Sequence, residues 1–226
     1  MHSTIRSLYR ELCGKYEDNA GAEIHLLGFS RGAFAVRSLA CLIDKVGLLR
    51  KKHLQKFCDD VYETWRSQDE DRFKKWAAKD GWHQAIFPVK ITSCGVWDTV
   101  SALLPPSTLS FVNHWVPSNL SFAFQALALH ERRYLFNPKL WKHASRSKTR
   151  IYQCWFAGDH SDIGGSWPDC GLANLTLIWM LAQYEKHFPQ MSINRRHLSE
   201  RLCPPGAAFP SLSHTLSTGK YTNGTR

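Results

Sequence analysis

The chain has 226 residues, 43% of them hydrophobic, and carries a formal net charge of +10. This length and apolar content suffice for one large globular domain or two small ones. No stretch reaches about 18 apolar residues without a charge, so we expect no membrane span, and the first residues lack the apolar region of a signal peptide.

The net charge and the cysteine pattern narrow the kinds of partner and the cellular compartment that we expect. Basic stretches such as 50–53 and 142–150 are spread along the chain. They fit either ordinary solvated faces or a surface attracted to anionic lipid headgroups or nucleic acid. No nucleic-acid motif accompanies them, so we expect no nucleic-acid partner. The seven cysteines are scattered without metal-type pairs, so we expect a reduced, cytoplasmic chain with no metal or other cofactor.

The first predicted elements are a helix, a turn and a strand. Residues 7–13 have the spacing of an amphipathic helix closed by Gly14, and 18–21 are rich in turn-forming residues. The apolar run 24–27 predicts a short strand before a glycine-containing turn.

That turn, Gly28-Phe29-Ser30-Arg31-Gly32, leads into a helix predicted over 33–49, which is apolar on nearly every face and has Gly47 near its end. This is the sequence form of a nucleophile elbow. In an elbow a serine sits on a strained strand-to-helix turn, and flanking glycines remove side chains that would collide there. The alternative is a Gly-Ser turn without chemistry, and the strand and helix on either side favour the elbow.

Two further predicted strands end in polar, reactive residues. The run 85–97 closes on Asp98, and the run 150–157 leads into a glycine-rich loop that holds His160. If the three strands are parallel, Ser30, Asp98 and His160 lie at the same edge of the sheet, beyond the carboxyl ends of the strands.

The chain order Ser30, Asp98, His160 is that of α/β-hydrolases. A serine hydroxyl is a weak nucleophile until an imidazole takes its proton, and the imidazole needs a carboxylate to hold its tautomer. Asp98 could instead cap a following helix, and His160 could be a hydrogen-bonded loop histidine. Asp159 and Asp162 compete for the carboxylate role, although their closeness to His160 in sequence favours a part in ordering the loop.

Four ordered blocks, 27–34, 95–100, 126–133 and 155–165, resemble a family of α/β-hydrolase domains typified by type VI secretion phospholipase effectors. The family includes many uncharacterised fungal and bacterial proteins, and the resemblance covers roughly residues 5–185. It implies hydrolysis of an ester, expected to be a lipid ester. It also implies Ser30 as nucleophile, Asp98 as orienting acid and His160 as general base.

The resemblance also implies a setting for these groups, with the backbone N–H of Arg31 as an oxyanion donor. The supporting motif residues are Gly28, Gly32, Asp162, Gly164 and Gly165. The chain departs from the family at His130, where an acidic residue is expected, and at Asp159, where a small apolar residue is usual. An early strand with an Asp-Gly-Thr-type segment is also missing. We therefore expect the N-terminal part of the sheet, and with it the second oxyanion donor, to be absent.

These patterns together predict an α/β protein with a three-layer α/β-hydrolase-like fold and a mostly parallel sheet, N-terminally truncated, over residues 1–203. Helical insertions are expected at 50–84, over the active-site edge, and at 105–147. The aromatic residues of 105–147 either line an acyl pocket or belong to the core. A helix is predicted over 172–187 and a flexible tail over 204–226.

The predicted function is that of a serine hydrolase of carboxylic esters, with a lipid or phospholipid as the expected substrate. The alternative is a catalytically inactive, hydrolase-like module that binds lipid or a protein partner. The missing part of the sheet favours this alternative, and the complete Ser-Asp-His trio contradicts it. The basic residues add an expectation of peripheral contact with an anionic membrane surface.

Overall fold

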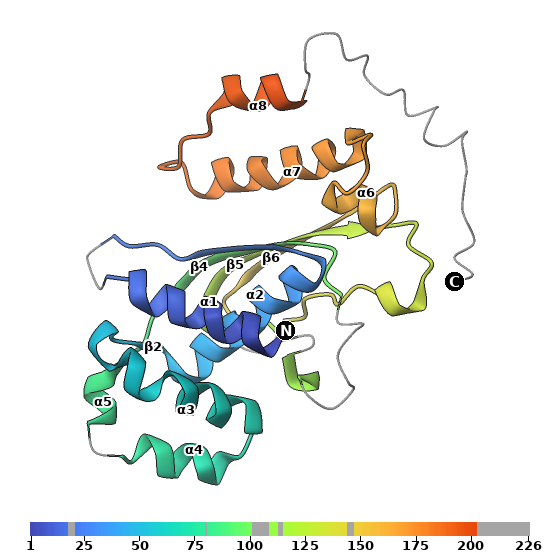
Figure 1. Cartoon of the computed structure of the whole chain (residues 1–226). Coiled ribbons are helices and arrows are strands. Elements are labelled where there is room, and N and C mark those ends of the chain that lie inside the picture. Colours follow the sequence, from blue (N-terminus) through green and yellow to red (C-terminus); the bar gives the residue numbers. More distant parts are fainter. Residues whose placement is uncertain (18–20, 80, 101–108, 113–114, 144–146, 203–226) are drawn as a thin grey trace.

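The computed structural model describes residues 1–17, 21–79, 81–100, 109–112, 115–143 and 147–202 (Figure 1). The helices are α1 (His2–Lys15), α2 (Ser30–Val46), α3 (Leu54–Ser67), α4 (Glu70–Ala77), α5 (Trp82–Ala85), α6 (His160–Gly164), α7 (Gly171–His187) and α8 (Arg195–Leu202). The strands are β1 (His25–Phe29), β2 (Leu48–Leu49), β3 (Ile86–Phe87), β4 (Ile91–Trp97), β5 (Leu120–Ala128) and β6 (Arg150–Phe156). Short 3-10 turns are η1 (Lys51–His53), η2 (Ser110–Val112) and η3 (Tyr134–Phe136).

Within the described residues, the main sheet has four strands in the order β1-β4-β5-β6, and all three pairings are parallel. In this register Phe29 lies opposite Trp97, which lies opposite Ala126. The carboxyl ends of β1 and β4 therefore meet at one edge, with Ser30 and Asp98 directly beyond them. The prediction of an α/β fold with a mostly parallel sheet is confirmed.

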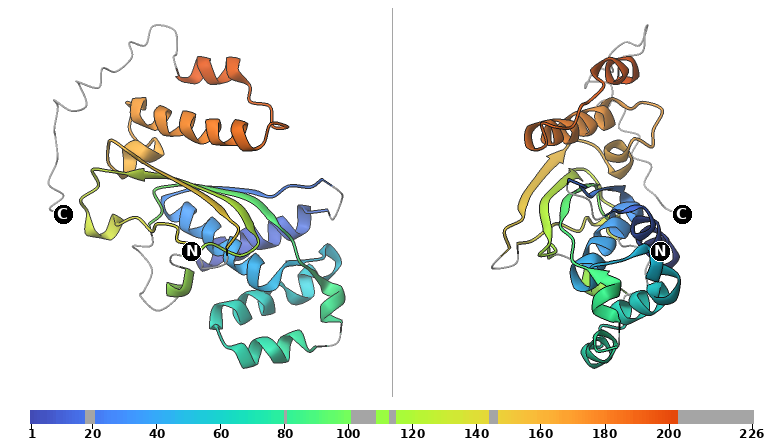
Figure 2. Two further views of the ribbon diagram at one scale, coloured as in Figure 1. Left: turned by 180° about the vertical axis from the view of Figure 1, so that it is seen from behind. Right: turned by 90° about the vertical axis from the view of Figure 1, so that its left-hand side faces the viewer.

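Helices cover both faces of this sheet, which makes three layers (Figures 1 and 2). On one face lies α2, whose buried side chains join those of α1 in the larger core; among them are Ile5, Tyr9, Phe34, Leu42 and Ile43. On the other face α7 packs Met180 and Tyr184 against Phe124 of β5. Because α2 begins at Ser30, the packing of α2 on the sheet also holds the elbow in place.

The predicted strand 85–97 is two strands. Ile86–Phe87 forms β3, which pairs antiparallel with β2, and Ile91–Trp97 forms β4 of the main sheet. Pro88 lies between them, and proline cannot donate a backbone hydrogen bond to a ladder. The prediction of one continuous strand was wrong for this reason, although Asp98 does follow the strand end as expected.

The predicted insertion 105–147 contains a central strand. Leu120–Ala128 forms β5, which pairs with β4 on one side and β6 on the other. Its residues are buried on both faces from Ala123 to Ala128, so the apolar run has no alternation to mark it as a strand. This part of the chain therefore belongs to the sheet, while residues 101–108, 113–114 and 144–146 lie outside the described residues.

The segment 50–84 is helical, as predicted, but lies away from the expected edge. The α3 helix buries Phe57, Val61 and Trp65 in the core that it shares with α1 and α2. Figures 1 and 2 show α3, α4 and α5 on the opposite side of α1 and α2 from α6 and α7. The apolar face of α3 thus stabilises the helical layer and does not cover the loop of His160.

Helix boundaries differ by small amounts from the predicted ones. The first helix runs through Gly14 to Lys15, and α2 ends at Val46 with Gly47 at φ 76°, a conformation that favours glycine. The helix predicted over 172–187 is confirmed as α7. The predicted tail, 204–226, lies outside the described residues.

Candidate active site

The elbow consists of β1, Ser30 and the first turn of α2. Ser30 has φ 58°, a left-handed conformation that is uncommon for a residue other than glycine. A Cβ atom on Gly28 would lie 2.7 Å from the carbonyl oxygen of Gly32 and 2.8 Å from the nitrogen of Ala33. The first glycine of the motif is therefore required by the close approach of β1 to α2. A Cβ on Gly32 would meet no atom within 4 Å, so packing does not require the second glycine.

Ser30, His160 and Asp98 form one chain of hydrogen bonds. The Oγ of Ser30 lies 2.7 Å from Nε2 of His160, and Nδ1 of the same imidazole lies 2.6 Å from Oδ2 of Asp98. Carboxylates only accept, so the network favours the tautomer in which Nδ1–H donates to Asp98 and Nε2 accepts from the serine hydroxyl. The structure thus brings together the three residues that the sequence singled out, although 130 positions separate Ser30 from His160.

Asp98 is fully buried directly after β4. Its backbone N–H donates to the carbonyl of Ala126 (2.8 Å), and its Oδ1 accepts from the N–H of Ala128 (3.0 Å). The residue also has φ 41°. These contacts direct Oδ2 at Nδ1 of His160, and Asp98 caps no helix among the described residues.

The loop of His160 is held by a capping box at the start of α6. The carboxylate of Asp159 accepts from the N–H groups of Ser161 (2.8 Å) and Asp162 (3.1 Å), and Asp162 accepts from the N–H of Asp159 (2.8 Å). Burial raises the pKa of Asp162. Asp159 and Asp162 therefore order the loop and leave the contact with Nδ1 of His160 to Asp98.

Two glycines of this loop have different roles. Gly165 adopts φ 78° at the end of α6. A Cβ on Gly164 would lie only 2.0 Å from the ring of Phe29, which itself lies 4.7 Å from the His160 ring, centroid to centroid. Gly164 therefore allows the elbow strand and the histidine loop to meet.

The family to which the chain belongs follows from comparison with known proteins. Residues 1–183 match the family described as "T6SS, Phospholipase effector Tle1-like, catalytic domain". The chain belongs to this family. Membership in the Tle1-like catalytic domains supports a hydrolase of the phospholipase or lipase type and an α/β-hydrolase-like fold.

A curated relative is the uncharacterized protein YEL023C of Saccharomyces cerevisiae, 33% identical over 96 residues. The aligned part is 37% of this chain and 13% of the yeast protein, so the chain spans only a small share of that relative.

Glu131 is a site residue of this Tle1-like domain that sequence analysis missed. Its carboxylate accepts from the backbone N–H of His160 (3.3 Å) and from the guanidinium of Arg133 (2.9 and 2.6 Å). Burial would raise the pKa of Glu131, but the hydrogen bonds from Arg133 and His160 more than offset it and lower that pKa to about 2. The signal in the sequence was an acidic residue inside the block 126–133.

We expect Glu131→Gln to destabilise the protein by about 1–3 kcal/mol and to lower kcat, because it removes the ion pair with Arg133 that positions the oxygen accepting from the His160 backbone. The pKa of Glu131 is lower in the folded protein than its ordinary value. The carboxylate therefore contributes to stability above the ordinary pKa of glutamate, and this contribution is lost as the pH falls towards about 2. Thermal unfolding measures the expected loss of stability, and the rate of ester hydrolysis measures the expected decrease in kcat. The control is Glu11→Gln at an exposed pair with Lys15, and identical unfolding of both variants would contradict the prediction.

Arg37 links α2, the helix that begins at the elbow, to the segment that contains Lys139 and Leu140. It is buried, donates to the backbone carbonyls of Lys139 and Leu140, and its guanidinium lies 3.7 Å from the ring centroid of Trp141. Burial lowers the pKa of Arg37 to about 10, which leaves it charged at neutral pH. Trp141 is therefore a core residue, in agreement with the alternative considered for the aromatic residues of 105–147.

The predicted oxyanion donor, the backbone N–H of Arg31, lies in the first turn of α2, next to Ser30. N–H groups of a first helical turn have no partner within the helix and carry a partial positive charge. A negatively charged oxygen at this point would therefore be stabilised. The Arg31 side chain itself is exposed.

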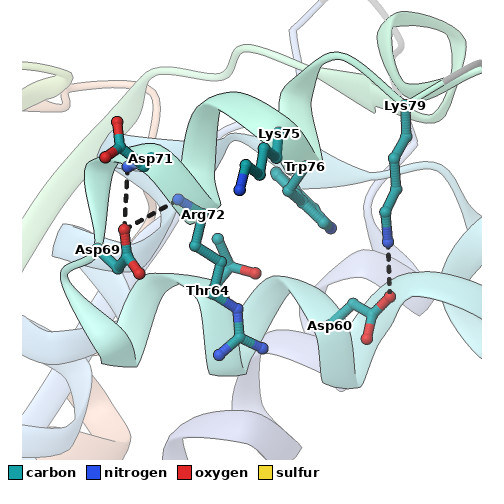
Figure 3. A pocket seen from close by; sticks show the side chains of 8 residues that line it. All are labelled: Asp60, Thr64, Asp69, Asp71, Arg72, Lys75, Trp76 and Lys79. Carbon is teal, nitrogen blue, oxygen red and sulfur yellow. Dashed lines mark hydrogen bonds and ion pairs between the residues drawn. The ribbon is translucent and has the colours of Figure 1, made fainter.

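A pocket of about 360 Å³ lies in the helical layer of the Tle1-like domain, between α3 and α4 (Figure 3). Its lining residues are Asp60, Thr64, Asp69, Asp71, Arg72, Lys75, Trp76 and Lys79. Lys79 pairs with Asp60 (3.5 Å), and the Asp69 carboxylate caps α4. Its lining has as many basic as acidic side chains, and it contains none of the predicted site residues.

Among the described residues, no group of three or more His, Cys, Asp or Glu side chains has an arrangement that could hold a metal ion. None of the helices described is both long enough and apolar enough to cross a bilayer.

Proposed function

We propose that this chain is a serine hydrolase of carboxylic esters, with a lipid or phospholipid as substrate, and that Ser30, His160 and Asp98 form its catalytic triad. The observation that carries the proposal is the pair of contacts at the imidazole, 2.7 Å from Nε2 to the Ser30 hydroxyl and 2.6 Å from Nδ1 to Asp98. Both distances lie within the range required for proton transfer between positioned groups.

In the proposed reaction, Ser30 Oγ attacks the ester carbonyl while Nε2 of His160 takes the hydroxyl proton. The buried carboxylate of Asp98 stabilises the imidazolium that forms. The carbonyl oxygen gains negative charge and accepts a hydrogen bond from the N–H of Arg31. His160 then gives its proton to the leaving alcohol, and a water molecule releases the acid from Ser30 by the same steps.

Two aromatic rings support the imidazole in this role. Phe29 and Phe136 place their ring centroids 4.7 and 4.9 Å from that of His160, with Phe136 edge-on. These contacts keep the imidazole in line between Ser30 and Asp98 while leaving Ser30 partly exposed.

Labelling with a fluorophosphonate probe tests the proposal without knowledge of the substrate. We expect the wild-type protein to be labelled and Ser30→Ala to lose all labelling, because the probe reacts with an activated serine. Ser166→Ala, at an exposed serine after α6, is the control and should label like the wild type. Absence of labelling in folded wild-type protein, shown by circular dichroism, would overturn the proposal and favour a non-catalytic module.

A further inference from the structure

The segment 129–136, which we call the site loop, has an inner face that holds the histidine. The Glu131 carboxylate accepts from the backbone of His160, and the Phe136 ring contacts the His160 ring. His130 Nδ1 accepts from the N–H of Gly158 (3.0 Å). The inner residues therefore fix the position of the site loop beside the candidate triad.

The outer face of the site loop is apolar and exposed. Leu129, Tyr134 and Leu135 are 58%, 88% and 57% exposed. Tyr134, Leu135 and Phe136 form the turn η3, and a 3-10 helix has about three residues per turn. Because Phe136 contacts His160, the other two residues of this turn, Tyr134 and Leu135, point away from His160. The exposure of Tyr134 and Leu135 agrees with this.

The site loop has more basic than acidic residues. It holds Arg132 and Arg133 against the carboxylate of Glu131, which pairs with Arg133 and contacts the His160 backbone. The whole chain carries a formal net charge of +10. Scattered exposed apolar residues are normal on a protein surface. Here Leu129, Tyr134 and Leu135 lie in one short loop with Arg132, beside His160. This arrangement is more specific than scattered exposure.

We propose that the outer face of the site loop docks onto an anionic lipid surface. Tyrosine, leucine and arginine side chains suit the boundary between headgroups and acyl chains, where an apolar body and a polar or charged tip are both satisfied. The esters of membrane lipids lie at that boundary, so a surface beside Ser30 must meet it. The positive charge favours a lipid surface over an apolar protein partner. The role of this surface in catalysis rests on the proposed function, whereas binding can be measured separately.

Vesicle co-sedimentation in a Ser30→Ala background measures binding without hydrolysis. The vesicles contain phosphatidylglycerol and phosphatidylcholine, and the full chain is used. We expect Tyr134→Ser combined with Leu135→Ser to lower partitioning at least about tenfold, because burial of two large apolar side chains is lost. The control is Trp115→Ser, a 62% exposed side chain before the opposite end of β5, which should bind like its parent.

The outcomes separate this inference from the proposed function. Equal binding of the double variant and its parent, or absence of binding by all proteins, would overturn lipid docking even if Ser30 reacts with the fluorophosphonate. Loss of binding in the double variant alone, with circular dichroism unchanged, supports docking. That result holds even if fluorophosphonate labelling fails and the hydrolase proposal falls.

Discussion

Asp98→Asn is expected to lower kcat for a p-nitrophenyl acyl ester about 10⁴-fold while leaving the fold intact. The Oδ1 of Asp98 accepts from Ala128, so the asparagine amide NH₂ would take the place of Oδ2 and face Nδ1 of His160. Nδ1 would then have to accept, which puts the ring proton on Nε2. In that tautomer Nε2 cannot take the proton of Ser30.

The matched comparison is Asp162→Asn. Asp162 lies two residues from His160 but accepts from the backbone N–H of Asp159, a contact that an asparagine oxygen can keep. We expect a loss of less than about tenfold, in line with weakening of one hydrogen bond. Steady-state kinetics on both purified variants decides the matter. A larger loss at Asp162 than at Asp98 would show that the acid has been assigned to the wrong residue.

Gly28→Ala is expected to destabilise the protein by about 3 kcal/mol or more and to remove activity as well. The added methyl would lie 2.7–2.8 Å from backbone atoms of Gly32 and Ala33, which cannot move as a flexible side chain would. The first turn of α2 would have to shift from β1, which moves both Ser30 and the N–H of Arg31. Thermal unfolding should show a decrease in Tm of about 6–12 °C.

Gly32→Ala is the control for this prediction. A Cβ there meets no atom within 4 Å, and the residue lies in the first turn of α2. Alanine is a better helix former than glycine by roughly 0.8–1.0 kcal/mol, so Tm should stay the same or rise slightly. Similar destabilisation by both variants would contradict the distinction that the structure makes between the two glycines of the motif.

Several parts of the fold and site followed from local patterns. The elbow around Ser30, the strand ends at Asp98 and His160 and the α7 helix were all predicted, because glycine spacing and apolar runs act over a few residues. The strand β5 was missed for a physical reason. A parallel strand buried on both faces has no alternation of polar and apolar residues, so Leu120–Ala128 resembled any buried segment.

The sequence by itself determined which chemistry-bearing residues follow the strands and the order Ser30, Asp98, His160, because these depend on backbone conformation close to each residue. Only the tertiary structure decided that Asp98, and not Asp162, contacts the imidazole. It also decided that Glu131 holds the His160 backbone and that Gly28, but not Gly32, has no room for a side chain. The contacts of His160 depend on atoms brought within a few ångströms by strand register and helix packing, and those of Gly28 depend on the path of the backbone through the elbow. Residue spacing along the chain does not encode such distances.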